Sequence, residues 1–304
     1  MGADPGARGR RRLLLGAAGV GCSLCLGRLA AAADAAAPLA QPAASAAAGA
    51  LLDSQLVRTG LYLIRGGGGN SLLRLSANGM LLIDGKSPGS HRALMSQVRR
   101  ISRLSDLPIR VLVLTDHHEE HSGDSAQFLA AHIPIVAQRR ALARLALPEA
   151  AEASPVAAFD DQRTLRLGGV EVQLKHFGPG CTDGDTVAYF PDMKVVALGD
   201  LFTPGPPTPD VAAGGSLVGW AAVLAQVLEL DVDYVVPGDG PVVGRDALVA
   251  YKDKVDAAVS RARALVAGGV DKDGLMAQWR TDDLGWRFDF SGPALDRFYA
   301  ELAR

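Results

Sequence analysis

A dense run of potential metal ligands occupies residues 116–124, which read DHHEEHSGD and follow the apolar run VLVL. Histidine and carboxylate side chains at this density are typical of a site for divalent metal ions. Asp116 and His118 are two positions apart, so they project to the same side of an extended chain, whereas the adjacent Glu120 and His121 diverge. This one loop therefore has the donors to contribute to two metal ions.

The elements on either side of this loop predict where it sits in the fold. Four aliphatic residues without a polar break, Val111 to Leu114, predict a strand buried on both faces. The stretch SAQFLAAH after the loop has the pattern of a helix that begins near Ser125. Open α/β sheets place their functional sites at the carboxyl ends of their strands. We therefore expect the metal site along one edge of a sheet.

The loop resembles the T-H-x-H-x-D-H-x-G signature of the metallo-β-lactamase superfamily. Four positions are in register: Thr115, His118, His121 and Gly123. Asp116 stands where that family has its first histidine, and Glu120 stands where it has an aspartate. Both departures keep a side chain that can bind a metal ion.

Three further stretches resemble the remaining ligand motifs of the family, in the family's order. Cys181 in GPGCTDGDT occupies the position of a third histidine, and Asp239 in VPGDGPV replaces the last one. Asp200 in ALGDLF matches without change the aspartate that bridges two metals. The resemblance thus implies two ion sites that share Asp200. The first comprises Asp116, His118 and Cys181, and the second comprises Glu120, His121 and Asp239.

The altered ligand set implies altered chemistry. Every departure goes to aspartate, glutamate or cysteine, which favours a re-tuned site over a lost one. Four carboxylates and a thiolate make the set strongly negative, so we expect a weaker Lewis acid and a higher pKa for bound water. Oxygen donors favour manganese or iron, whereas the Cys181 thiolate favours zinc or iron. We expect a divalent metal, zinc first and up to two ions, with manganese or iron as alternatives.

The resemblance implies a hydrolase of small molecules, in which a metal-bound hydroxide attacks an ester, thioester, lactone or lactam-type bond. Asp200 would position this nucleophile, and Glu120 is the second candidate catalytic residue. Two alternatives stay open. The loss of three of the five family histidines is compatible with an inactive binding protein without tightly held metal. The thiolate of Cys181 is compatible with a mononuclear or dinuclear iron protein that does redox work.

Three neighbours of these residues are assigned supporting roles. His117 faces away from its neighbours on an extended chain, which predicts a surface position or a contact with a ligand. Asp84, at the end of the run GMLLID, is predicted to be a turn residue beside the site rather than a ligand. Asp185 is predicted to hold the Cys181 loop by hydrogen bonds to its backbone.

The order of apolar runs predicts an α/β (α+β) protein, an αββα sandwich of the metallo-β-lactamase type. LYLIR, SLLRLSA and GMLLIDG form one β-rich half, and TLRLGG, VEVQLKHF, TVAYF and KVVALGD form another. Helices are predicted at 217–230 and 245–266. We expect the metallo-β-lactamase-like domain at 55–268 and a helical extension at 269–304.

The amino terminus predicts export. Arg10 to Arg12 precede the mildly apolar LLLGAAGVGCSLCLG, and Ala30 to Ala33 provide small residues for cleavage, which resembles a twin-arginine signal. We expect a signal peptide at 1–33, an Ala/Pro-rich linker at 34–54 and a periplasmic protein without a stable membrane span. A net charge of −2 without a later basic run argues against a nucleic-acid partner. The oligomeric state stays open.

Overall fold

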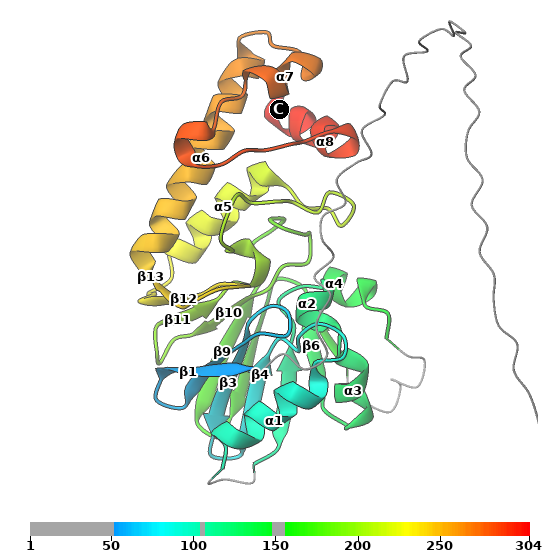
Figure 1. Cartoon of the computed structure of the whole chain (residues 1–304), viewed down its shortest axis with the longest axis vertical. Coiled ribbons are helices and arrows are strands. Elements are labelled where there is room, and N and C mark those ends of the chain that lie inside the picture. Colours follow the sequence, from blue (N-terminus) through cyan, green and yellow to red (C-terminus); the bar gives the residue numbers. More distant parts are fainter. Residues whose placement is uncertain (1–51, 104–106, 148–155) are drawn as a thin grey trace, which may run out of the picture. The chain divides into compact units, whose positions relative to one another are not determined.

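The computed structural model describes residues 52–103, 107–147 and 156–304 (Figure 1). These residues all belong to the second of two compact units, which spans 44–304. The predicted signal peptide at 1–33 and nearly all of the predicted linker at 34–54 lie outside the described residues, so both stay predictions. The first strand begins at Asp53, at the very end of that linker.

In the described part of the chain, seven strands form the first sheet in chain order, β1 to β7. The first four are an antiparallel meander: β1 Asp53–Arg58, β2 Leu61–Arg65, β3 Ser71–Ser76 and β4 Gly79–Ile83. The next three run parallel to β4: β5 Ile109–Val113, β6 Ile135–Gln138 and β7 Val156–Phe159. Parallel neighbours need crossover connections. These contain α1 His91–Ile101, α2 Glu119–Ser122, α3 Ser125–Ala130 and α4 Arg139–Arg144.

Six described strands form the second sheet, in the order β13-β12-β11-β10-β9-β8. Their bounds are β8 Gln162–Leu167, β9 Val170–Lys175, β10 Val187–Phe190, β11 Val195–Ala197, β12 Tyr234–Val236 and β13 Val243–Gly244. The short 3-10 helix η2, Gly199–Leu201, follows β11, and α5, Leu217–Leu228, leads to the parallel strand β12. The chain ends with α6 Arg245–Ala267, α7 Lys272–Gln278, the 3-10 helix η3 Asp282–Leu284 and α8 Gly292–Leu302.

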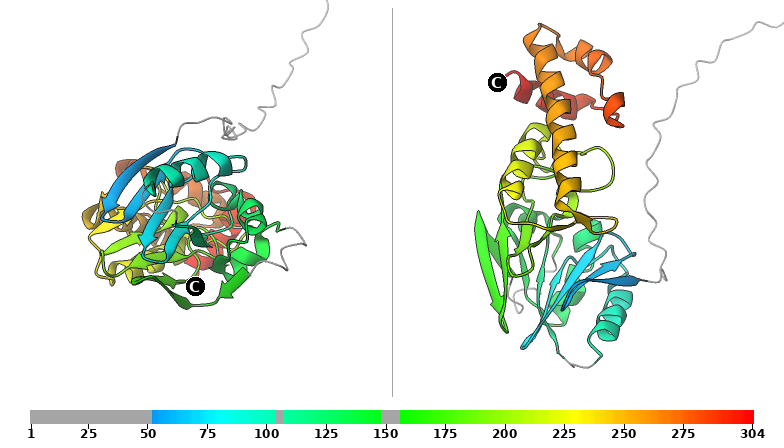
Figure 2. Two further views of the ribbon diagram at one scale, coloured as in Figure 1. Left: turned by 90° about the horizontal axis from the view of Figure 1, so that it is seen from below. Right: turned by 90° about the vertical axis from the view of Figure 1, so that its left-hand side faces the viewer.

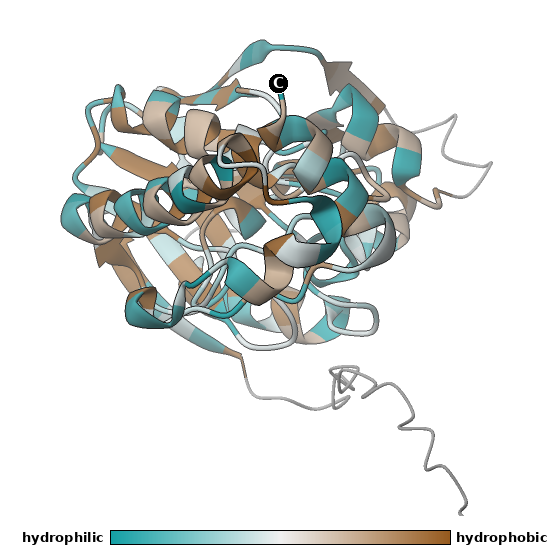
Figure 3. Ribbon diagram, turned by 90° about the horizontal axis from the view of Figure 1, so that it is seen from above, coloured by the Kyte–Doolittle hydropathy of each residue, from teal (hydrophilic) through white to brown (hydrophobic). Residues whose placement is uncertain are grey.

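Three apolar clusters hold these elements in four layers. Residues of both sheets, such as Leu63 and Phe190, form the cluster between the sheets. Phe128 of α3 packs on the outer face of the first sheet, and Trp220 of α5 and Val255 of α6 belong to the cluster on the second (Figures 1 and 2). In Figure 3, hydrophobic residues gather on the interior strands, while the helices alternate in hydropathy. The predicted αββα sandwich is confirmed.

The segment after α6 folds back onto that helix through aromatic contacts. Trp279 stacks on Phe288 with ring centroids 4.5 Å apart and contacts Phe298 at 4.9 Å. Its indole Nε1 donates a hydrogen bond of 2.8 Å to the carbonyl of Ala258 in α6. These contacts fix the loop that carries Trp286, whose side chain is also buried. The helical extension predicted at 269–304 contains α7 and α8.

Candidate metal centre

His121 is the most deeply buried histidine of the ligand loop, and its orientation is fixed from behind. The single turn of α2 directs His121 into the protein and leaves Glu120 exposed. His121 Nδ1 lies 2.9 Å from Asp84 Oδ2. The same carboxylate accepts hydrogen bonds from the backbone N–H and the hydroxyl of Thr115, at 2.8 and 2.7 Å. Asp84, at the end of β4, therefore holds the imidazole so that Nε2 faces the site.

Asp200 lies between the two histidines. It is part of η2, directly after β11, so the end of a central strand delivers it to the site. Its Oδ1 lies 3.1 Å from His121 Nε2, and its Oδ2 lies 3.0 Å from His118 Nδ1. Cys181 Sγ is 3.9 Å from the same Oδ2. One carboxylate thus contacts donors on both sides with different oxygens.

Two glycines are required by the close packing around this centre. A Cβ at Gly69 would lie 2.6 Å from His121 Cε1, and a Cβ at Gly238 would lie 2.9 Å from Asp200 Oδ1. The backbone of both loops therefore approaches the ligand side chains at distances that only glycine permits. Asn70 holds the second loop in place, because its side-chain amide donates to the carbonyls of Pro237 and Gly240, both at 2.9 Å.

Potential ligand atoms gather in three groups within the described residues, each with its atoms within 4.8 Å of one another. The groups are Asp116, His121 and Asp200; His118, Cys181 and Asp200; and His117, His118 and Asp210. The first two share Asp200, which the family resemblance had also placed in both sites. Asp116 groups with His121, whereas the resemblance had placed it with His118 and Cys181. Both sets combine nitrogen with oxygen or sulfur donors, which suits zinc and iron.

The electrostatics of the centre favour bound positive charge. Burial raises the pKa of Asp116 to about 7. Although burial opposes charge on His118, its hydrogen bond to Asp200 and the charge of Asp116 raise the pKa of this imidazole to about 10. The same balance, led by the charges of Asp116 and Asp84, raises the pKa of His121 well above its usual value. The buried carboxylates attract positive charge, which protonated histidines supply here. A divalent metal ion would supply the same positive charge, so the residues fit a metal ion.

Cys181 and the loop that carries it are also buried. Burial, together with the negative charges of Asp185 and Asp200, raises the pKa of the Cys181 thiol well above its usual value. Metal coordination deprotonates a thiol outright, so this side chain would become a ligand only when an ion is bound. The carboxylate of Asp185 accepts hydrogen bonds from the Thr182 backbone N–H at 3.0 and 3.1 Å. The predicted role of Asp185 in holding this loop is confirmed.

Asp210 is a site residue that the sequence reasoning missed. Its Oδ2 lies 3.4 Å from His118 Nε2 and 4.0 Å from His117 Nε2. Its backbone N–H donates to the carbonyl of Cys181 at 2.8 Å, so the loop after η2 is fastened beside the centre. The residues before it read TPGPPTP, a pattern that predicts only an irregular loop. His117 is half-buried beside Asp210, so it lies next to the site.

Lys86 is a second residue without a signal in the sequence. Its side chain is fully buried, and its Nζ donates hydrogen bonds to the carbonyls of Ile64 and Gly69, at 2.7 and 2.6 Å. Burial lowers the pKa of Lys86 to about 7, although the charges of Asp84 and Asp239 raise it. This lysine therefore fastens the glycine-rich hairpin that covers His121.

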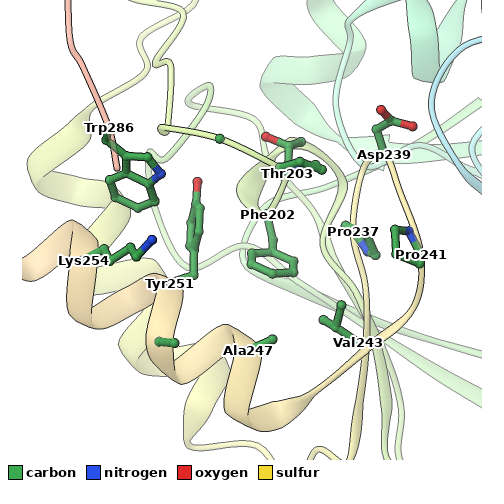
Figure 4. Close-up of a pocket in the computed structure, with 13 residues that line it drawn as sticks. Phe202, Thr203, Pro237, Asp239, Pro241, Val243, Ala247, Tyr251, Lys254 and Trp286 are labelled. Carbon is green, nitrogen blue, oxygen red and sulfur yellow. The ribbon is translucent and has the colours of Figure 1, made fainter. Parts of the chain in front are cut away.

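Two of the predicted ligands are placed apart from the others. Glu120 is exposed on the outer side of α2, and Asp239 is exposed at the rim of an apolar cavity (Figure 4). Neither belongs to any of the three groups formed by the described residues. Their roles as ligands, and the catalytic role of Glu120, stay predictions.

Comparison with known proteins agrees with the fold. The family model described as the metallo-beta-lactamase superfamily matches residues 64–239. Because the match spans more than half of the 304 residues, the chain belongs to the metallo-β-lactamase superfamily. Members of this superfamily are mostly hydrolases of small molecules, and their fold generally binds divalent metals. The protein is thus metallo-hydrolase-like, with candidate ligands in the expected place.

Individual relatives are more distant. The chain is 27% identical over 191 residues to the 2,4-dinitroanisole O-demethylase subunit alpha of Nocardioides sp. (strain JS1661). The alignment covers 62% of this chain and 57% of that relative, so the chain spans little more than half of its length. In the part of the chain that the structure describes, no helix is long and apolar enough to cross a membrane.

Solved structures confirm the fold alone. The DIM-1 metallo-β-lactamase superposes with a TM-score of 0.57 at 17% identity, covering 68% of this chain and 98% of that one. A metallo-β-lactamase from Pontibacter korlensis gives the same TM-score at 18% identity, covering 66% and 99%. Nearly all of each lactamase is therefore matched, while about a third of this chain lies outside the superposition.

Proposed function

We propose that the protein is an exported, metal-dependent hydrolase that cleaves an ester, thioester, lactone or lactam-type bond in a small molecule. One observation carries the proposal: Asp200 contacts both histidines, with Oδ1 3.1 Å from His121 Nε2 and Oδ2 3.0 Å from His118 Nδ1. A carboxylate that presents one oxygen to each of two donor groups is suited to bridging two ions. Zinc is the first candidate, with manganese or iron as alternatives.

The side chains have separate tasks in this proposal. Asp116, His118, His121, Cys181 and Asp200 would hold the ions, which would lower the pKa of a water molecule and polarise the bond to be cleaved. Asp84 keeps His121 Nε2 directed at the centre, and Asp210 contacts the far nitrogen of His118. Asp200 orients the attacking water by accepting its hydrogen bond, and Glu120 stays the second candidate for that task. Asp116 itself is buried, whereas His118 and Asp200 are partly exposed on the open side of the centre.

Two observations bear on which bond is cleaved. The name of the Nocardioides relative adds an aryl methyl ether to the bonds worth testing. The altered ligands bear on this choice, because a more negative shell makes bound metal a weaker Lewis acid. Activated substrates with good leaving groups are therefore expected to react first. Export to the periplasm is tested separately, by the location of the mature chain after fractionation of its host.

One observation favours a second candidate, a binding protein without tightly held metal. Each ring nitrogen of His118 and His121 lies within 3.4 Å of a carboxylate oxygen. Imidazolium and carboxylate charges can therefore balance one another in this centre without an ion. The two candidates differ in one measurable quantity, the metal content of the purified protein.

The deciding experiment is elemental analysis of the full chain purified without added metal, beside the Asp200→Ala variant. We expect about one to two equivalents of zinc, manganese or iron in the wild type and a clear loss in the variant. His132→Asn, at an exposed histidine with a left-handed backbone, is the matched control. Hydrolysis of ester, thioester, lactone, β-lactam and 2,4-dinitroanisole substrates is then followed with the bound metal. Equal, substoichiometric metal in both proteins would overturn the hydrolase proposal.

A further inference from the structure

An apolar cavity of about 430 Å³ lies beside the candidate metal centre, between the loops after β11 and β12 and helix α6 (Figure 4). Its walls include Phe202, Pro237, Pro241, Val243 and Ala247. Phe202 is only two residues from Asp200, and the turn that contains both prolines also contains Gly238, which packs on Asp200. Cavities of this size and composition hold the apolar part of a small ligand.

Aromatic rings close one side of the cavity. Tyr251 of α6 contacts Phe202 edge-on, with centroids 4.9 Å apart, and contacts Trp286 in the same manner at 5.2 Å. Figure 4 shows the Tyr251 ring between the other two, with its hydroxyl at the end away from α6. Trp286 comes from the C-terminal segment, which lies beyond the stretch matched by the family model. Rigid ring edges of this kind favour a planar aromatic ligand over a flexible aliphatic one.

The hydroxyl of Tyr251 lacks a partner. The side chain is only 7% exposed, and its oxygen is buried with no hydrogen-bond partner among the described residues. Burial raises the pKa of Tyr251, and the proximity of Cys181 and of the Asp200 carboxylate raises it further. The hydroxyl is thus a protonated donor within electrostatic range of the metal centre. Buried donors are nearly always satisfied, so an unpaired one indicates an acceptor on a ligand.

A lysine at the open side of the cavity is also unpaired. Lys254 is exposed, and its Nζ lies 5.3 Å from the centroid of the Trp286 ring. None of the carboxylates in the described part of the chain forms an ion pair with it, whereas Lys252 on the same helix pairs with Asp256. The one carboxylate among the lining residues, Asp239, points away from the apolar walls in Figure 4. The open side therefore suits an anionic group.

We propose that this cavity binds the substrate's planar aromatic ring, with an anionic substituent at Lys254 and with the Tyr251 hydroxyl donating a hydrogen bond to the end nearest the metal centre. This inference rests on the proposed hydrolase function and narrows its substrates to aromatic anions. Trp286 and Phe202 contact the ring, and the bond to be cleaved projects toward Asp200. Tyr251 is a binding residue in this arrangement, since its hydroxyl contacts the substrate beside the reacting bond.

Binding is tested apart from catalysis with three probes, by isothermal titration calorimetry on the full chain. Naphthalene-2-carboxylate combines the ring and the charge, naphthalene-2-carboxamide has the ring alone, and cyclohexanecarboxylate has the charge alone. We expect the first probe to bind about tenfold more tightly than either of the others. Its advantage over the amide falls as salt is raised to about 0.5 M, because Lys254 is exposed.

Four variants locate the binding site. Ala250→Phe fills the cavity from an exposed position of α6 and is expected to abolish binding of naphthalene-2-carboxylate. Tyr251→Phe removes one hydroxyl with the packing kept, and Lys254→Gln removes one charge; each is expected to weaken binding about three- to tenfold. Lys252→Gln, which removes a charge from the same helix outside the cavity, is the matched control and binds as the wild type does. Circular dichroism confirms that each variant is folded.

The outcomes separate this inference from the proposed function. Binding with the expected pattern of losses, but without metal or hydrolysis, would support the cavity and overturn the hydrolase. Conversely, a metal-loaded protein that hydrolyses simple esters, yet binds naphthalene-2-carboxylate no better than the amide, would overturn the inference alone. Equal affinity in the wild type and in Ala250→Phe would also overturn it. Metal content is measured for every variant and is expected to stay unchanged, since none of the four residues belongs to the candidate ligand groups.

Discussion

The candidate metal centre and the apolar cavity beside it are built from different parts of the chain. The centre takes its residues from loops that directly follow strands, all within the stretch matched by the family model. The cavity takes its residues from two of these loops, from one face of α6 and, through Trp286, from the C-terminal segment. The candidate metal centre thus lies within the stretch matched by the family model, whereas the cavity also needs residues beyond it.

The two regions also differ in polarity and in the contacts that hold their side chains in place. The centre gathers charged groups whose positions are fixed by hydrogen bonds, as with Asp84 behind His121. The cavity gathers apolar groups whose positions are fixed by ring contacts, as with Trp286 on Tyr251. Substitutions in the first region should therefore change metal binding, and substitutions in the second should change ligand affinity. Single substitutions in each region can therefore separate metal binding from ligand binding.

The largest effect is expected from Asp200→Ala. Removing the shared carboxylate withdraws a ligand from both groups that contain it, so metal content and hydrolysis should fall more than about a hundredfold. Affinity for naphthalene-2-carboxylate should change by less than about threefold, because the cavity walls remain. Elemental analysis and calorimetry measure the two quantities on one sample. Parallel loss of metal and of probe binding would show that the regions are not separable.

Asp84→Asn is expected to weaken metal affinity by about ten- to a hundredfold without removing a ligand. The amide cannot accept the hydrogen bonds from Thr115 and His121 as the carboxylate does. Titration of the Co²⁺-substituted protein against a chelator measures the affinity, and the visible spectrum of Co²⁺ reports a change in ligand geometry. Asp161→Asn, at an exposed aspartate, is the control. An unchanged spectrum and affinity would mean that Asp84 does not position His121.

Lys86, beside the metal centre, is expected to make the stability of the protein depend on pH. Its pKa is about 7 in the folded protein against an ordinary 10.5, so the unfolded chain binds more protons between these values. The stability of the wild type should therefore rise with pH in this window relative to Lys86→Met, by about 1.4 kcal/mol per pH unit near its middle. Below about pH 7 the difference should be constant. Urea unfolding of both proteins at pH 6 to 10 measures it, and a flat difference throughout would contradict the buried, neutralised lysine.

Trp286→Ala should lower the affinity of the cavity for its ligand without changing the metal content. Loss of the ring removes one aromatic wall, so affinity for naphthalene-2-carboxylate should fall about fivefold while metal content stays constant. Phe288→Ala is a useful comparison, because it removes a neighbouring ring that is outside the cavity lining. A larger loss of affinity in Phe288→Ala than in Trp286→Ala would indicate that the C-terminal segment acts through its packing alone.

The smallest effect is expected from the pair Glu120→Gln and Asp239→Asn. Both side chains are exposed, and the candidate ligand groups among the described residues do not include them. At least one ion per chain should remain bound in the double variant, and elemental analysis measures this directly. Complete loss of metal would show that the exposed carboxylates turn inward to complete the centre, as the family resemblance implies.

The sequence predicted the site residues that follow a recognisable strand, and it did not predict the others. The sheets bring the recognisable apolar runs together, so the proximity of the ligand candidates that follow these runs was predictable. These candidates are Asp116, His118, His121, Cys181 and Asp200. The grouping of Asp116 with His121 was not, because it depends on the single helical turn of α2. Asp210 was missed because a proline-rich loop has no helix or strand periodicity from which the position of its side chains could be predicted. Lys86 was missed because a lysine in a turn predicts exposure, and only the two carbonyls that it contacts explain its burial.

The turn at 237–241 lies between the candidate metal centre and the apolar cavity. Its prolines line the cavity, while Gly238 lies so close to Asp200 that even one added carbon would be 2.9 Å from Oδ1. Because this contact is close, we expect a bulky ligand that displaced the prolines to displace the Asp200 carboxylate as well. Engineering the cavity for larger ligands should therefore begin at the opposite wall, where the exposed Ala247 and Ala250 of α6 allow its volume to be changed without a contact to Asp200.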